Sequence, residues 1–143
     1  MREALRLARE AALAGEVPVG AVLASAAGEI IGRAANSPIS TRDPTAHAEI
    51  LALRQAAERT ANYRVEDATI YCTLEPCVMC AGALVAARIK RLVFGARDLR
   101  FGGVRSKFRI ADSDVLNHAV LVEEGLLATE CVELLRGFFE ARR

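Results

Sequence analysis

The sequence predicts an α/β fold with three layers, in which helices cover both faces of a five-stranded mixed sheet. Segments with apolar residues at helical spacing alternate with short runs rich in Val, Ile, Leu and Ala. The chain has 143 residues, 52 % of them hydrophobic, so we expect residues 1–143 to form a single domain with its own core. It opens with no charged and apolar leader and has no run long enough to span a bilayer, so we expect a cytoplasmic protein.

The first half of the chain is expected to contain a helix, a β-hairpin and a second helix. Residues 2–14 place apolar side chains on one face of a helix that Gly15 can end. The β-rich segments 17–25 and 30–34, separated by a turn, indicate a hairpin. A polar loop should follow, and the second helix should begin near His47.

The second half is expected to alternate strands and helices. Residues 68–73 form a nearly continuous apolar strand, which is typical of a strand covered on both faces. A helix over 76–87 begins at a proline and leads to a strand at 91–95. A long loop precedes a strand at 119–123 and a last helix at 126–141. A loop of that length is either functional or contains a short helix of its own.

One histidine and two cysteines form a candidate metal site. His47 begins the second helix, while Cys77 and Cys80 are spaced so that their side chains share one face of the third. This donor set suits zinc, and because it has only three protein ligands it leaves a position open, as catalytic zinc sites do. Glu49 follows His47 closely and can serve as acid and base. The pattern H-x-E…P-C-x-x-C is the signature of zinc deaminases.

The same residues allow other interpretations. The C-x-x-C pair is also compatible with half of a closed structural zinc site or with a redox motif. The chain has no second C-x-x-C or H-x-x-H to close such a site, and a redox motif leaves the histidine and the glutamate without a role. The remaining cysteines, Cys72 and Cys131, lie in apolar surroundings and are expected to be buried thiols.

Positive charge is concentrated in one segment. The chain carries a formal net charge of +1, but residues 88–109 contain eight basic side chains against Asp98 alone. This segment is a candidate anion-binding surface, and arginines scattered along a solvated loop are the alternative. Within it, we expect Arg105 and Lys107 to hold phosphates.

Several longer stretches resemble the bacterial TadA-type tRNA-specific adenosine deaminases, and the resemblance covers almost the whole chain. It implies the cytidine-deaminase-like fold, one zinc ion per subunit and a homodimer. It also implies conversion of the wobble adenosine of a tRNA anticodon to inosine. The stretches include residues 16–22, 36–39, 43–49, 73–83 and 94–98.

The resemblance further implies roles for single residues. His47, Cys77 and Cys80 would hold the zinc, and Glu49 would shuttle protons. Asn36 would hydrogen-bond the flipped base, since an amide offers both a donor and an acceptor, and a turn residue is the alternative. The residues implied to lie near bound RNA are Asp98, Phe139, Arg142 and Arg143.

Two other functions stay open. One is deamination of free bases or nucleosides, such as guanine, cytosine or cytidine, on the same fold. The other is a non-catalytic, zinc-stabilised RNA-binding module, and Glu49 argues against it because a purely structural site needs no such carboxylate. The segment 99–109 departs from the family in being bulkier and more basic.

Overall fold

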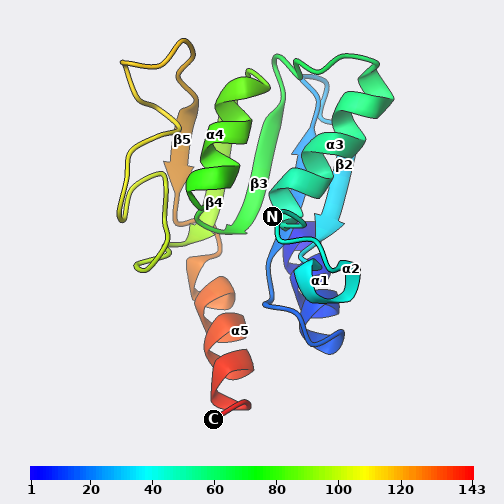
Figure 1. The fold of residues 1–143 in the computed structure, drawn as a ribbon, viewed down its shortest axis with the longest axis vertical. Helices are drawn as coiled ribbons and strands as arrows, with labels where there is room; N and C mark the ends of the chain where they lie inside the picture. Colours follow the sequence, from blue (N-terminus) through cyan, green and yellow to red (C-terminus); the bar gives the residue numbers. More distant parts are fainter.

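The computed structural model describes residues 1–143 and arranges five strands in one mixed sheet (Figure 1). The strands are β1 (Gly20–Ala24), β2 (Ile30–Ala35), β3 (Thr69–Leu74), β4 (Arg91–Ala96) and β5 (Leu121–Glu124). Their order is β2-β1-β3-β4-β5, in which β1 is antiparallel to both neighbours and β3, β4 and β5 are parallel. The predicted α/β fold is confirmed.

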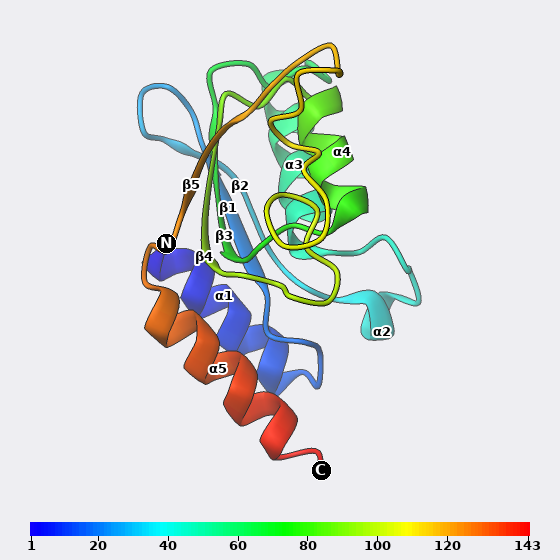
Figure 2. The same ribbon diagram turned by 90° about the vertical axis from the view of Figure 1, so that its left-hand side faces the viewer.

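Helices cover both faces of this sheet (Figure 2). On one face lie α1 (Arg2–Leu13) and α5 (Ala128–Glu140). On the other lie α3 (Ala48–Thr60) and α4 (Val78–Ala86), and the short α2 (Pro38–Thr41) stands in the connection before α3. No helix of the protein has the length and apolar character needed to cross a membrane.

Two glycines let helices approach the sheet closely. A Cβ atom added to Gly20 in β1 would lie 1.9 Å from the carbonyl oxygen of Ala4 in α1. One added to Gly32 in β2 would lie 2.2 Å from the carbonyl oxygen of Ala52 in α3. A side chain at either position would push a helix away from the sheet. Each strand therefore has a glycine where the helix crosses it.

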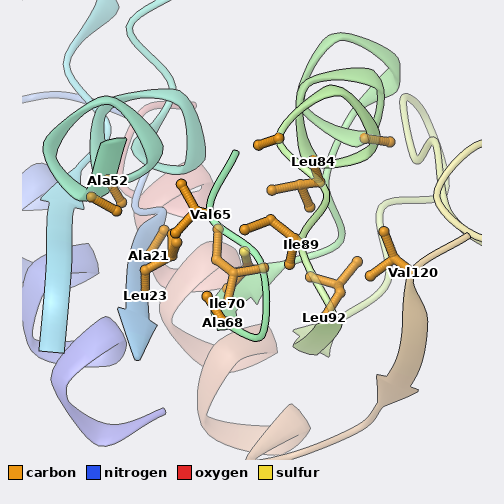
Figure 3. Packing of buried hydrophobic residues seen from close by; sticks show 14 of the residues in the cluster. Ala21, Leu23, Ala52, Val65, Ala68, Ile70, Leu84, Ile89, Leu92 and Val120 are labelled. Atoms are coloured by element: carbon orange, nitrogen blue, oxygen red, sulfur yellow. The ribbon is translucent and has the colours of Figure 1, made fainter. Parts of the chain in front are cut away.

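The main hydrophobic core lies between the sheet and the layer formed by α3 and α4 (Figure 3). Leu23, Ile70 and Leu92 enter it from β1, β3 and β4, and Ala52 and Leu84 close it from the two helices. All five residues are fully buried. Because α1 and α5 cover the opposite face, the central strands carry apolar residues on both sides, which explains the nearly continuous apolar pattern of β3.

The structure differs from the predicted elements where a segment is held by a distant residue. The predicted polar loop before the second helix contains α2, because the buried carboxylate of Glu16 accepts hydrogen bonds from its first backbone N–H groups. These come from Ile39 at 3.2 Å and Ser40 at 2.7 Å. The third helix begins at Val78 rather than at the proline, so that Cys77 occupies the N-cap position.

Candidate active site

The starts of α3 and α4 bring the predicted metal ligands together. His47 is the N-cap residue of α3, Cys77 is the N-cap residue of α4, and Cys80 follows in the first turn of α4. The Nδ1 atom of His47 lies 3.5 Å from the Sγ atom of Cys77 and 3.5 Å from the Sγ atom of Cys80. All three potential ligand atoms lie within 4.8 Å of one another, so one ion can contact them all.

This donor set fits a zinc ion. With Zn–S bonds of about 2.3 Å and Zn–N bonds of about 2.0 Å in a tetrahedron, neighbouring ligand atoms are about 3.5 to 3.8 Å apart. Both nitrogen–sulfur separations match that spacing. Both cysteines also lie at the start of α4, where unpaired N–H groups and the positive end of the helix dipole favour thiolates.

The surroundings of the four cysteines set their protonation. Hydrogen bonds with Cys80 and His47 lower the pKa of Cys77 to about 4, which favours the thiolate form of this sulfur. The same contacts with Cys77 raise the pKa of Cys80 well above its ordinary range and raise the pKa of His47. Cys72 and Cys131 are buried free thiols, as predicted, and burial raises the pKa of both, to about 11 for Cys131.

Glu49 lies beside these ligands in the first turn of α3. It is only 4 % exposed, yet it lines the same cleft as His47 and Cys77. Burial raises the pKa of its carboxyl group to about 7. A carboxyl group at this position is a candidate for accepting and returning protons.

A cleft of about 800 Å³ leads to Glu49 and the metal ligands. Its volume is within the range of small-molecule sites, about 300 to 1,000 Å³. Three of the predicted substrate residues meet in its walls, namely Asn36 after β2, Asp98 after β4 and Phe139 on α5. Asn36 is 8 % exposed, so its place in the cleft wall favours contact with a ligand over a free surface turn.

Glu75 anchors one wall of the cleft, the segment 97–106, which we call the rim loop. The Glu75 side chain is buried, and burial acts to raise its pKa, but hydrogen bonds from the rim loop hold that pKa below its ordinary value. No local signal marks this role, because the partners follow 23 to 31 residues later in the chain. The donors are the hydroxyl group of Ser106 and the backbone N–H groups of Asp98, Val104, Arg105 and Ser106.

Much of the positive charge in residues 88–109 is already paired, which narrows the predicted anion-binding surface. The side chain of Arg105 is only 22 % exposed and forms an ion pair with Asp112, with a nitrogen–oxygen distance of 3.1 Å. Lys107, in contrast, is exposed and forms no ion pair. The arginine pairs are Arg91–Glu123, Arg97–Glu124, Arg105–Asp112 and Arg109–Asp112.

The C-terminal residues predicted to lie near RNA fall in two places. Phe139 lines the cleft, whereas Arg142 and Arg143 follow the end of α5 and are exposed. The guanidinium group of Arg142 lies over the ring of Phe138, with its carbon 3.5 Å from the ring centroid. The contact of both arginines with RNA stays a prediction.

Known proteins resemble this chain over its whole length. A family model described as MafB19-like deaminase matches residues 1–143. A protein of Haemophilus influenzae named tRNA-specific adenosine deaminase is 52 % identical over 143 residues, which are 100 % of this chain and 83 % of that protein. One of the same name from Aquifex aeolicus is 47 % identical over 100 % of this chain and 93 % of its own length.

A solved structure shows the same likeness in three dimensions. It is described as a study of A-to-I editing by tRNA:A34 deaminases at the wobble position of transfer RNA. Its TM-score to this structure is 0.90 at 44 % identity, and the match covers 94 % of this chain and 97 % of the other. The chain therefore belongs to the MafB19-like deaminase family, among the tRNA-specific adenosine deaminases.

Proposed function

We propose that this protein is a tRNA adenosine deaminase that converts the wobble adenosine of an anticodon to inosine, with zinc held by His47, Cys77 and Cys80. The observation that carries the proposal is the cleft in which Glu49 lies beside those ligand atoms. Relatives named tRNA-specific adenosine deaminase support tRNA as the substrate. A tRNA substrate supports the proposal that the protein acts in the cytoplasm.

The residues of the cleft divide the chemistry among them. When bound, zinc supplies the Lewis acidity that activates water for attack near neutral pH. Glu49 takes a proton from the attacking water and delivers protons to the ring nitrogen and the departing amino group. The carbon–nitrogen bond to that group breaks, a carbonyl replaces it, and each adenosine consumes one water and releases one ammonia. Asn36 offers a donor and an acceptor to the purine edge.

We expect an anticodon stem-loop with a wobble adenosine to be deaminated far more efficiently than free adenosine. In a single-stranded loop the target base leaves the stack at little cost, and the rest of the RNA supplies binding energy that positions the ring. The assay measures inosine and ammonia from the stem-loop and, separately, from adenosine, cytidine, cytosine and guanine. An equal kcat/KM for free adenosine would identify a small-molecule deaminase instead.

Salt and one exposed lysine give a second measure of RNA binding. The logarithm of the affinity should fall with the logarithm of salt concentration, with a slope of about 0.7 per phosphate neutralised. Lys107→Glu should raise KM for RNA and flatten this slope, because Lys107 is exposed and unpaired. Lys90→Glu is the control. Lys90 is also exposed, but it pairs with Asp67 and precedes β4, at the end of that strand opposite to Asp98, whereas the backbone N–H group of Lys107 donates a hydrogen bond to the carbonyl oxygen of Gly102 in the rim loop. An affinity for RNA that does not change with salt concentration would contradict the proposal that RNA is the substrate.

We also propose that two copies of the chain associate through the outward face of α4. The helix has no charged residue, and only its inner side packs into the core. A helix that is apolar all round is normally buried, and a second copy offers a matching apolar face. The dimer would also add surface beside the cleft for a folded anticodon arm. The residues on the outward side of α4 are Val78, Met79, Gly82, Ala83 and Ala86.

Light scattering at micromolar protein should give twice the 15.4 kDa mass of one chain. Gly82→Lys should give a monomer, because it adds a charge to the centre of this face. A Cβ atom added to Gly82 meets nothing within 4 Å, and the same holds for Gly137 in α5. Since lysine forms helices better than glycine, both variants should fold, and Gly137→Lys should stay a dimer. A monomeric wild type, or a dimeric Gly82→Lys, contradicts this interface.

A further inference from the structure

Phe101 displays an aromatic ring on the wall of the cleft. It is 64 % exposed, and Leu99 near it in the rim loop is 71 % exposed, although both line the cleft. The guanidinium carbon of Arg100 lies over the Phe101 ring, 5.9 Å from its centroid. Apolar surface left open to water at the mouth of a site is surface that a ligand can cover. The ring and the neighbouring positive charge therefore point to a ligand that is both flat and anionic.

Backbone contacts hold Phe101 in place. The carboxylate of Asp98 accepts hydrogen bonds from the backbone N–H groups of Arg100 and Phe101, both at 3.0 Å. The next residue, Gly102, packs so tightly that an added Cβ atom would lie 2.5 Å from the carboxylate of Glu75. The backbone that carries the ring is thus fixed before any ligand arrives, which reduces the conformational freedom lost on binding.

We propose that Phe101, with Arg100 beside it, is the platform on which the unpaired base next to the target base stacks. The inference rests on the proposed function, because a base lifted out of an RNA loop leaves its neighbour without a stacking partner. An aromatic face accepts any base, and a guanidinium group beside it suits the adjoining phosphate. Phe101 is a substrate-binding residue in this scheme, since it contacts the flanking nucleotide and takes no part in proton transfer.

The test compares Phe101→Ala, Phe101→Tyr and Phe108→Ala on the anticodon stem-loop. Phe108 is a matched control, because it is 58 % exposed and lies close by in sequence but does not line the cleft. Phe101→Ala should raise KM about tenfold, within the range for loss of one stacked base, and leave kcat unchanged, because the stack forms in the ground state and in the transition state alike. Phe101→Tyr keeps the ring and should restore KM, and Phe108→Ala should change neither constant.

Two further substrates isolate the stacking contact. Each lacks the base of one nucleotide that flanks the target adenosine, on the 5′ side in one RNA and on the 3′ side in the other. On one of them, wild type and Phe101→Ala should have the same KM. Three results would overturn the platform. The first is a higher KM for Phe101→Ala than for wild type on both abasic RNAs, and the second is a fall in kcat in place of the rise in KM. The third is a changed mass in light scattering, which would assign Phe101 to a subunit contact.

The outcome for this platform is separable from the outcome for the proposed function. If wild type and Phe101→Ala deaminate the intact stem-loop with the same KM and kcat, the platform is wrong and the proposed function stands. If wild type does not deaminate the stem-loop at all, the proposed function fails, and the platform fails with it.

Discussion

Glu49→Gln should lower turnover by about 10⁴-fold while the chain keeps its metal and its fold. The carboxyl group is 4 % exposed, and an amide of the same shape fills the space but cannot accept and return a proton. General acid–base catalysis contributes about 10² to 10⁴-fold, and because this one group serves more than one proton transfer, we expect a loss at the upper end. The measurements are kcat on the stem-loop, zinc content by elemental analysis, and the midpoint of thermal unfolding.

The matched control for this variant is Glu58→Gln, which makes the same chemical change at an exposed position of α3. It should leave turnover, zinc content and stability unchanged. Near-normal activity of Glu49→Gln would show that its assigned role is wrong. Loss of zinc or of the fold in Glu49→Gln would place the residue among the structural groups of the site instead.

Cys77→Ala should lose zinc and a large part of its stability together. Metal affinity is linked to folding, because the ligands converge only in the folded chain. Zinc at 1,000 times its dissociation constant stabilises the folded state by about 4 kcal/mol, and the variant should lose a term of that size. A chelator should lower the unfolding midpoint of the wild type toward that of the variant and leave the variant unchanged.

Cys131→Ala is the control for this substitution. Cys131 is a buried thiol that contacts none of the proposed ligands, so the variant should keep one zinc per chain even if the lost sulfur weakens packing. A full complement of zinc in Cys77→Ala would contradict the ligand assignment. Zinc lost from Cys131→Ala would show that metal content follows general stability rather than the donor set.

The placement of the proposed reactive groups on their helices could be predicted from the sequence, because local spacing determines how they lie. Cys77 and Cys80 share a helix start, and His47 and Glu49 share another, so each pair is oriented by its own backbone. The predicted order of strands and helices did not determine which helices are neighbours, so the meeting of the two helix starts comes from the structure, which places α3 and α4 on the same face of the sheet. The fold class followed from the same order, since a strand covered on both faces differs in composition from one that faces water.

Contacts between residues far apart in the sequence could not be predicted, because local spacing says nothing about them. The carboxylates of Glu16 and Glu75 each hold a segment more than twenty residues away, and nothing beside either residue announces its partner. The charge of residues 88–109 was overstated because β5, which supplies carboxylates to Arg91 and Arg97, comes later in the chain. Counting charge along a segment takes no account of neighbours that arrive from across the sheet.

The anchoring of the rim loop by Glu75 bears on how the cleft can acquire new preferences. Four of the five donors to this carboxylate are backbone N–H groups, which every residue except proline provides. The exposed side chains of Leu99, Arg100 and Phe101 are not among the donors. Their identity can therefore change without disturbing the loop's course. In this wall of the cleft the backbone is held independently of the exposed side chains. Single substitutions of those side chains can therefore alter which nucleotides are accepted with little loss of folding stability.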